Sequence, residues 1–364
     1  MRRGQITGGQ LFWVAFSAMF PTINLLLPGD LLRLGGRSAW WTPLLAAVPA
    51  CAFAWAVGAG GGRCGDLVRA ARHGLGPVFG RVVLLLAWAA MGVYTVLAVR
   101  ESIDLSAQTF IFREVPVPIL ALLGLIPAAV FAWLGPVVIA RVATLLAAAG
   151  LTVYLGVLVA SLPMAQVIWA LPLLPRDLRF ASLHPLDLMW IWLVEPALVG
   201  SILMHRVAAR DRGQAGKILA AAVAAAALST AAGLWVMTAN IGPQVAATLT
   251  IPLASLVRGV DVGNVQHLDT LVLPTMVVAS ALKVGIFFYV WARLGAGLLA
   301  GWARIALAVE VAAAGVLAIV LLPSPSAADR ALYAWAGLRA LPVLAGALPL
   351  AYALAAVRRG VRQR

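Results

Sequence analysis

Residues 11–34 read LFWVAFSAMFPTINLLLPGDLLRL, an apolar run that is interrupted by Pro21 and by Pro28-Gly29. A second run, LDLMWIWLVEPALVGSILM at 186–204, has Glu195-Pro196 at its centre. Proline lacks an amide hydrogen and clashes with the preceding turn, so it kinks or breaks a helix. Inside a bilayer, the freed backbone groups need protein, ion or water partners. Broken segments in corresponding positions of two halves indicate a transporter binding site.

The composition is that of an integral membrane protein. Of the 364 residues, 63% are hydrophobic and only 11% are charged, and the mean hydropathy is +0.98. Apolar runs of about 18 residues or more predict spanning helices. We expect ten transmembrane helices, at 11–34, 40–60, 82–104, 116–134, 137–160, 186–204, 217–241, 270–292, 297–322 and 331–357.

The net charge of +14 is interpreted as a topology signal. If the N-terminus is cytoplasmic, the loops and tails on that side carry most of the arginines and only Asp66 and Asp211 as acids. The other side carries arginines and acids in equal number. This positive-inside bias places both termini in the cytoplasm and favours contact with anionic membrane lipids. No nucleic-acid partner is expected. Cys51 and Cys64 are predicted to form neither a disulfide nor a metal site.

The broken segments divide the chain into two sets of five helices. The first repeat covers about 10–160 and the second about 186–357, within a single transmembrane domain, 1–364. Because five is odd, the second set enters the membrane from the opposite face. The predicted fold is therefore an all-α integral membrane protein, with ten transmembrane helices in a five-plus-five inverted repeat and broken helices 1 and 6. We expect Gly58–Gly65 to be a flexible turn and Leu256–Leu273 to hold a short amphipathic helix at the outer surface.

Ionisable residues inside a membrane are costly, so they indicate function. Glu195, at the sixth-segment break, is predicted to bind a proton or a ligand ammonium group; alternatively it bonds the backbone freed by Pro196. Lys283 is predicted to replace a coupling ion or to pair with Glu195; alternatively it extends to the interface. Glu310 lies outside the broken segments. A functional role is one interpretation of it, and a pairing with Arg304 or a packing role is the alternative.

The first break is surrounded by small polar groups. Ser17, Thr22 and Asn24 lie beside Pro21, where helix ends would offer amide donors for a carboxylate and carbonyls for a cation. The alternative is a proline that only kinks a continuous helix, with Ser17 bonding back to a carbonyl. Tyr94 and Trp192 are candidate pocket walls, although aromatic residues at helical spacing also serve packing.

Enzyme signatures are absent from the sequence. It contains neither His-Glu-x-x-His nor Gly-x-Ser-x-Gly, and its four histidines share no metal-ligand spacing. We therefore predict no enzyme, no catalytic residue, no cofactor and no metal site.

The N-terminal stretch 5–48, QITGGQLFWVAFSAMFPTINLLLPGDLLRLGGRSAWWTPLLAAV, resembles the spore germination permease family. These are the B-type subunits of nutrient germinant receptors, within the amino acid–polyamine–organocation superfamily. The resemblance rests on the phrase Ile6-Thr7-Gly8-Gly9-Gln10, on Leu27-Pro28, and on the Gly-x-x-Ala-Trp turn at 36–40. The chain departs from the family at 267–271, HLDTL, where the family often has an arginine.

The resemblance implies a permease-like subunit that binds a small nutrient, such as an amino acid, in spore germination. Its partners would be a larger membrane subunit and a lipoprotein subunit, in the bacterial cell membrane or the spore inner membrane. An autonomous proton-coupled amino acid transporter is the alternative. Carried over to this chain, the ligand would lie between helices 1, 3, 6 and 8, in a pocket lined by Pro21, Thr22, Asn24, Tyr94, Trp192, Glu195, Gly200, Ser280 and Lys283.

Overall fold

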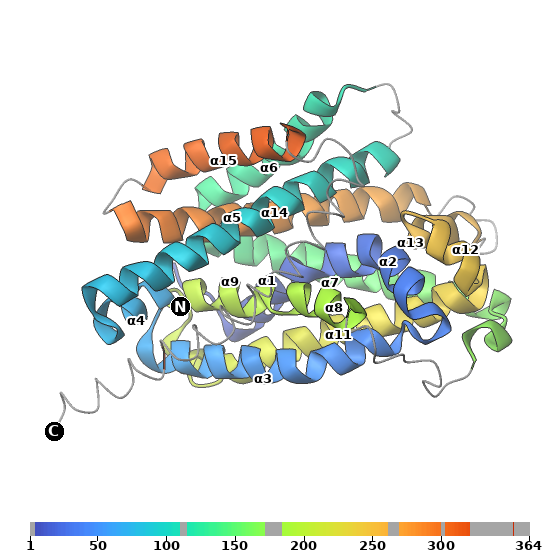
Figure 1. Cartoon of the computed structure of the whole chain (residues 1–364), viewed down its shortest axis with the longest axis horizontal. Helices are drawn as coiled ribbons and strands as arrows, with labels where there is room; N and C mark the ends of the chain where they lie inside the picture. The colour runs from blue at the N-terminus through green and yellow to red at the C-terminus, as the bar shows by residue number, and fades with distance from the viewer. Residues whose placement is uncertain are drawn as a thin grey trace.

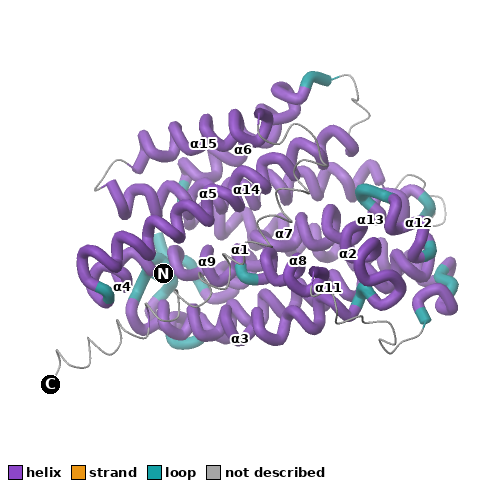
Figure 2. The backbone as a smooth tube through the Cα atoms, in the orientation of Figure 1, coloured by secondary structure: helices purple, strands orange, loops and turns teal. Residues whose placement is uncertain are grey.

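The computed structural model describes residues 4–109, 115–171, 184–260, 269–299, 303–320 and 352. Across these residues the chain is helical nearly throughout, and the isolated bridge between Ile6 and Val207 is the one β-type pairing (Figure 2). Seven helical segments in the described part are long and apolar enough to cross a membrane. The long helices lie roughly along one direction, with α3 and α11 on one side of the bundle and α6 and α15 on the other (Figure 1).

The helices follow the predicted segments closely. They are α1 (Gly8–Pro21), the π-helix η1 (Thr22–Leu26), α2 (Leu27–Gly35), the 3-10 turn η2 (Gly36–Ser38), α3 (Trp41–Cys64), α4 (Leu67–Gly74), α5 (Gly76–Thr109), α6 (Val117–Leu134), α7 (Pro136–Ser161), the 3-10 turns η3 (Leu162–Met164) and η4 (Val167–Ala170), α8 (His184–Leu193), α9 (Glu195–Leu203), α10 (Ala209–Arg212), α11 (Ala215–Ile241), α12 (Pro243–Thr248), α13 (Pro252–Arg258), α14 (Asp269–Leu299) and α15 (Ala303–Val320). The tenth predicted segment, 331–357, lies outside the described residues, apart from Tyr352.

The first helix begins at a capping box. The Thr7 hydroxyl accepts the Gln10 amide at 3.3 Å, and the Gln10 side chain accepts the Thr7 amide at 3.0 Å. Two of the donors that a helix start leaves unpaired are satisfied in this way. The Thr-x-x-Gln phrase that resembles the family therefore has a structural role, which is to fix where α1 starts.

The irregularity at Pro21 takes the form of a π-helix. After α1 the chain continues as η1, in which the Leu27 amide donates to the carbonyl of Thr22, five residues back. Such a widened turn absorbs the missing proline hydrogen bond without unwinding the chain, and π-helical turns often occur at functional sites. Ser17 does not bond back to a carbonyl, because its buried hydroxyl has no partner among the described residues.

The sixth segment is also broken, as predicted. Helix α8 ends at Leu193, Val194 forms a turn, and α9 begins at Glu195. Pro196 occupies the second position of α9, where a proline is tolerated because that amide would have no helical partner. The break therefore places the Glu195 carboxyl at the first residue of a new helix, in the interior of the bundle.

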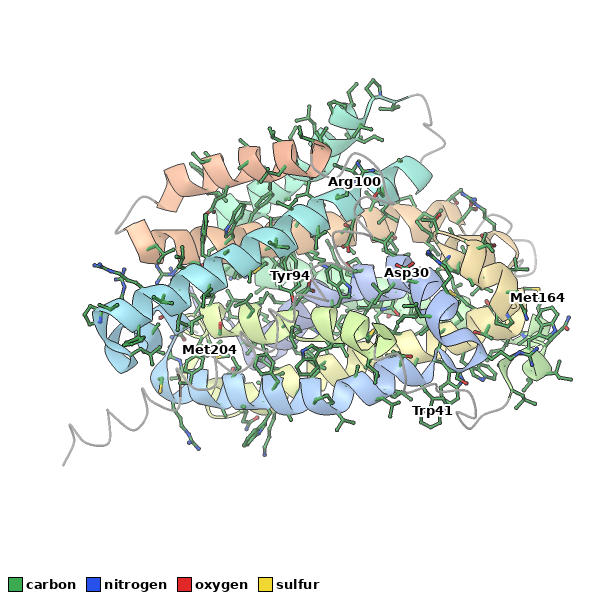
Figure 3. All side chains as sticks on the ribbon, in the orientation of Figure 1. Asp30, Trp41, Tyr94, Arg100, Met164 and Met204 are labelled. Carbon is green, nitrogen blue, oxygen red and sulfur yellow. The ribbon has the colours of Figure 1, made fainter. Side chains whose placement is uncertain are left out.

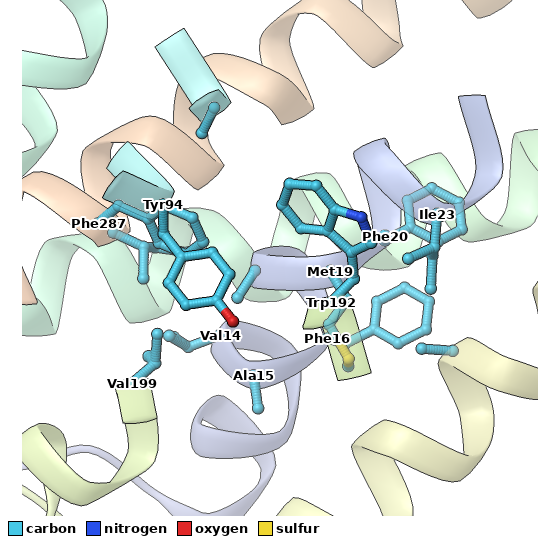
Figure 4. Packing of buried hydrophobic residues seen from close by; sticks show 14 of the residues in the cluster. Val14, Ala15, Phe16, Met19, Phe20, Ile23, Tyr94, Trp192, Val199 and Phe287 are labelled. Atoms are coloured by element: carbon cyan, nitrogen blue, oxygen red, sulfur yellow. The ribbon is translucent and has the colours of Figure 1, made fainter. Parts of the chain in front are cut away.

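Aromatic side chains surround the centre of the fold. Along α1, Phe12 stacks on Phe16 with ring centroids 6.1 Å apart, and Phe16 stacks on Phe20 at 4.9 Å. Phe20 packs against Tyr154 on α7 with ring centroids 5.5 Å apart. Figure 4 shows Phe16 and Phe20 among the packed residues of the interior. From Val14 to Phe20 every α1 side chain is buried, which is the pattern of a helix surrounded by other helices. Helix α1 is thus held on all sides, next to the break in α8–α9.

Glycines bring α3 against α11. A β-carbon at Gly58 would lie 2.7 Å from the Cα atom of Gly216, and one at Gly62 would lie 2.2 Å from the carbonyl of Arg212. The expectation of a flexible turn at 58–65 was wrong, because α3 stays helical to Cys64. Small residues allow two membrane helices to approach backbone to backbone, and this packing explains the glycine run.

Two short helices cover α2 at the opposite end from residue 4. Helices α12 and α13 follow α11, and a β-carbon at Gly29 in α2 would meet the carbonyl of Leu249 at 2.5 Å. A short helix was expected within 256–273, and residues 261–268 of that stretch lie outside the described residues. Just before it, Leu253, Leu256 and Val257 of α13 are buried, so α13 packs on the bundle.

Candidate functional site

Four polar side chains from four different helices meet at the two irregular segments. Lys283 on α14 is 1% exposed, and its ammonium donates a hydrogen bond to the Thr22 hydroxyl at 2.5 Å. Thr22, the first residue of the π-helix, in turn donates to Glu101 Oε2 at 2.7 Å. The Lys283 ammonium also lies 3.7 Å from Glu101 Oε2 and 3.5 Å from Glu195 Oε1. We call Thr22, Glu101, Glu195 and Lys283 the central cluster.

The two carboxyl groups of the central cluster are held differently. Glu101 accepts the Thr22 hydroxyl, whereas neither oxygen of Glu195 accepts a hydrogen bond from any described residue. The side chain of Glu195 is 1% exposed and that of Glu101 is 17% exposed. The alternative in which Glu195 bonds the freed backbone beside Pro196 is therefore not seen. A buried carboxyl without hydrogen bonds is costly. Both oxygens of Glu195 can therefore still accept hydrogen bonds from a proton donor or a ligand.

Glu101 was not among the predicted site residues. The charge count placed it among the acids on the side of the membrane opposite the termini, but α5 continues through Thr109. Within this part of α5, Ser106 Oγ donates to the Ser102 carbonyl at 2.7 Å, and Arg100 forms an ion pair with Asp104. One signal was available: Glu101 follows Tyr94 by seven residues, which places both on the same helix face.

Aromatic rings enclose the ammonium of Lys283. It lies 4.3 Å from the ring centroid of Trp192 on α8 and 5.1 Å from that of Phe287 on α14. Tyr94 meets both rings edge-on, at 6.1 Å and 6.4 Å. Tyr94 lies near the middle of the bundle, between Met204 towards one end and Asp30 towards the other (Figure 3). Because ring faces attract cations, these residues hold the ammonium near the middle of the bundle, and Lys283 does not extend to either end of it.

The charges of the central cluster do not balance when all its groups are ionised. Two carboxylates, Glu101 and Glu195, face one ammonium, Lys283. An unpaired charge at the bilayer centre costs at least about 2.5–3.5 kcal/mol. One further positive charge, either a proton or a cationic group of a ligand, would remove that imbalance. The arrangement is therefore chemically suited to bind a proton or an ammonium group at Glu195.

The remaining predicted residues lie around the central cluster but do not join it. Asn24 donates to the Phe20 carbonyl at 3.1 Å and to Ser229 Oγ at 3.4 Å, so it links the π-helix to α11. The space beside Gly200 is filled by Leu219 of α11, whose Cδ1 would be 2.6 Å from a β-carbon. Pro21 and Ser280 are buried, and no polar contact links either of them to the described part of the cluster.

Glu310 forms a separate pair. Its Oε1 accepts the indole N–H of Trp88 on α5 at 2.9 Å, and its side chain is buried between α5, α14 and α15. This agrees with the packing role that was one of its two alternatives. The side chain of Arg304, the predicted partner, lies outside the described residues.

A second polar group closes the bundle end at which α1 starts. Asp66 is fully buried and caps α4 by accepting the Arg69 amide at 3.0 Å. Arg293 lies 3.3 Å from it and His205 lies 3.6 Å from it. We call Asp66, His205 and Arg293 the Asp66 cluster. Burial lowers the pKa of His205 from its ordinary value, against the opposing effects of the Ile202 carbonyl and Asp66, so the imidazole is neutral at pH 7.

The start of the chain is tied to this same end. The Ile6 amide donates to the Arg206 carbonyl at 2.8 Å, and the Ala208 amide donates to the Ile6 carbonyl at 2.9 Å. The Gly8 amide donates to Asp211 Oδ2 at 2.9 Å. These bonds connect the start of α1 to the segment between α9 and α11, which follows the sixth-segment break.

Solved transporter structures share this fold. One of them is Mhp1, a nucleobase-cation-symport-1 family transporter, in a closed conformation with bromovinylhydantoin bound. It matches with a TM-score of 0.64 and 13% identity, and the match covers 95% of this chain and 78% of that chain. Mutants of the manganese transporter of Eremococcus coleocola match with TM-scores of 0.52 and 0.53 and 15% identity, covering 96% of this chain and 76% of that chain. At these identities the likeness shows the fold alone, which is the all-α membrane fold with broken helices that the sequence predicted.

Sequence comparison identifies the family. No curated protein matches the chain significantly. A family model described as "Spore germination protein", the spore permease family, matches residues 5–324, which include every helix from α1 to α15. Together with the transporter fold and the apolar spans, this match supports an integral membrane permease or transporter. The chain belongs to the spore germination protein family of membrane permeases.

Proposed function

We propose that this protein is a permease-like membrane subunit that binds a small nutrient, an amino acid, during spore germination. The observation that carries the proposal is the central cluster, in which the buried carboxyl of Glu195 and the partly buried carboxyl of Glu101 share one ammonium at two irregular helices. A zwitterion has one charge of each sign, so it fits a site that already contains both. Membership of the spore germination family supports the biological role.

The ligand carboxylate would bind near Lys283 and the first turn of α9. That helix begins at Glu195, so the partly positive end of its dipole lies at the break. Lys283 would supply the main donor, because Pro196 has no amide hydrogen and the Ala197 and Leu198 amides already donate to the Val194 carbonyl. The ligand ammonium would bind Glu195, which accepts no hydrogen bond within the described structure. Trp192 and Tyr94 would form the walls of the pocket, since both are buried beside the cluster.

Glu195 would exchange a proton for the ligand ammonium. With the ligand absent, a proton on Glu195 balances the charge of the cluster, because Glu101 is already stabilised as an acceptor by Thr22. When the ligand ammonium arrives, it replaces that proton as the positive partner of Glu195, while the ligand carboxylate adds one negative charge that Lys283 and the partly positive start of α9 would offset. Lys283 would supply the positive charge that a coupling ion supplies elsewhere, so no dissolved metal ion is required.

The cellular setting is part of the same proposal. Both termini would be cytoplasmic, as the positive-inside bias predicts, in the bacterial cell membrane or the spore inner membrane. The protein would act in a germinant receptor with a larger membrane subunit and a lipoprotein subunit. The second candidate is an autonomous proton-coupled amino acid transporter, which is supported by the fold shared with transporters and by the exchangeable proton on Glu195.

Thermal unfolding of the purified protein with single amino acids tests the proposal. A bound ligand raises the apparent stability of the folded state. We expect stabilisation by at least one common amino acid, and none by its amide or its N-acetyl derivative, which lack one of the two charges. Glu195→Gln should abolish the effect, whereas Glu310→Gln, the matched control, should keep it. Stabilisation by the N-acetyl derivative, or an unaltered response of Glu195→Gln, would contradict the proposal.

Uptake distinguishes the two candidates. Proteoliposomes that contain this chain alone should bind the identified amino acid without accumulating it if the protein is a receptor subunit. Accumulation of the radiolabelled amino acid, driven by an imposed proton gradient, would favour the transporter instead.

A further inference from the structure

A groove opens between the start of α1 and the segment that joins α10 to α11. Its volume is about 460 Å³, and its lining includes Phe12 of α1 and Lys217 and Ile218 of α11. Gly9 forms part of the same wall, and a β-carbon at that position would meet no atom within 4 Å. The groove lies at the bundle end of the Asp66 cluster, far from the central cluster, and the proposed function makes no use of it.

The lining changes from charged to apolar along the two helices. Arg210 and Lys217 are exposed, and they lie where the chain enters α11. Ala221 follows Lys217 by four residues and therefore lies one turn further along the same face. Phe12 lies one turn inside the start of α1. Since α1 and α11 both belong to spans that are apolar enough to cross a membrane, the charged part lies at the membrane edge and the apolar part extends inward.

The charged part has a surplus of one positive charge. Asp211 is engaged, because it accepts the Gly8 amide at 2.9 Å and lies 3.7 Å from Arg210. Lys217 forms no ion pair or hydrogen bond with any described residue. The groove thus combines one uncompensated cation with an apolar floor, which is complementary to an anion that carries a hydrocarbon chain.

We propose that this groove binds one anionic phospholipid. Its phosphodiester would lie between Arg210 and Lys217, and an acyl chain would run along Phe12 and Ile218. Basic pockets between membrane helices attract anionic lipid headgroups, and the apolar floor selects a lipid over a free phosphate, which could occupy only the charged half. The lipid would bridge α1 and α11, beside the capping box of α1 and the bond from the Gly8 amide to Asp211 of α10.

A lipid titration of the purified protein in detergent tests this site. Phosphatidylglycerol should raise the unfolding temperature, whereas phosphatidylcholine and inorganic phosphate should not. Lys217→Gln should increase the phosphatidylglycerol concentration needed for half of this effect by about five-fold, since each interfacial cation contributes about that factor. Arg69→Gln is the matched control, because Arg69 is an exposed cation on α4 outside the groove; it should leave the titration unchanged.

A second variant tests the apolar half. Gly9→Leu fills the open space beside α1 and retains every charge, so it should weaken phosphatidylglycerol binding, measured as lipid retained by the protein in native mass spectrometry. The proposal is overturned if Lys217→Gln titrates like Arg69→Gln, or if Gly9→Leu retains as much lipid as the unmodified protein. It is also overturned if inorganic phosphate stabilises the protein as much as phosphatidylglycerol does.

Discussion

Lys283→Met removes the only ammonium of the central cluster while it keeps a long unbranched side chain. In the structure this ammonium lies 3.7 Å from Glu101 and 3.5 Å from Glu195, and the Lys283 side chain is 1% exposed. The substitution therefore leaves the buried Glu195 and the partly buried Glu101 without their positive partner. Removing one member of a buried ion pair costs about 3–5 kcal/mol of unfolding free energy, and the lost contact with the Trp192 ring adds to the destabilisation.

The chain contains its own control. Its one other lysine, Lys217, is exposed and forms no ion pair with the described residues, so Lys217→Met should change the unfolding free energy by less than about 0.5 kcal/mol. Both variants are compared by denaturant unfolding of the purified protein in one detergent without phospholipid, so that the groove at Lys217 is empty in both. We expect Lys283→Met to unfold at clearly lower denaturant concentration and Lys217→Met to unfold with the unmodified protein.

A triple variant separates the loss of charge pairing from the loss of packing. Adding Glu101→Gln and Glu195→Gln to Lys283→Met makes every member of the group neutral, and neutral replacements of whole buried ion groups are often tolerated. Most of the lost stability should therefore return, although ligand binding should not. The reasoning is refuted if Lys283→Met is as stable as Lys217→Met, or if the triple variant is no more stable than Lys283→Met.

Three further predictions concern positions outside the central cluster. Gly58→Ala should destabilise the protein by about 1–3 kcal/mol through overpacking against α11. Gly156→Ala is the control, because a β-carbon there would meet nothing within 4 Å, and it should be neutral or stabilising by up to about 1 kcal/mol. Equal denaturation midpoints of the two variants would contradict this. Because burial lowers the pKa of His205, its contribution to stability is present above about pH 6.5 and is lost as the pH falls through the lower folded-state value. The unfolding temperature should therefore fall less between pH 8 and pH 5 in His205→Gln than in the unmodified protein, and identical profiles would argue against it. Glu310→Gln should keep the full ligand-induced rise in unfolding temperature, since its partner is Trp88 and not the cluster; a lost response would assign Glu310 to the site.

The fold was predictable because hydrophobic length and proline position act locally. A run such as 11–34 must be helical in a membrane whatever surrounds it, and Pro196 must begin a helix or break one. The form of the first irregularity was not predictable, because Pro21 is compatible with an unwound segment or with the π-helix that forms. The glycine run at 58–65 was misinterpreted for a related reason: its role depends on α11, which is far away in the sequence.

The candidate site was predictable where a charge interrupts an apolar run. Glu195 and Lys283 were recognised because each lies inside such a run, and the structure places them 3.5 Å apart. Glu101 was missed because it belongs to a polar stretch, 100–104, that resembles a loop flank when only composition is considered. Its place in the cluster depends on how far α5 extends and on how it faces α1, and tertiary packing decides both.

The exchange of a proton for the ligand ammonium at Glu195 is the central claim, and calorimetry measures it directly. Once an amino acid that binds is identified, its binding heat is measured at one pH in buffers that differ in their enthalpy of protonation. The slope of heat against buffer enthalpy gives the number of protons exchanged. We predict the release of about one proton for each ligand bound, and none from Glu195→Gln. Binding that releases no proton, or an equal release from Glu195→Gln, would contradict the account.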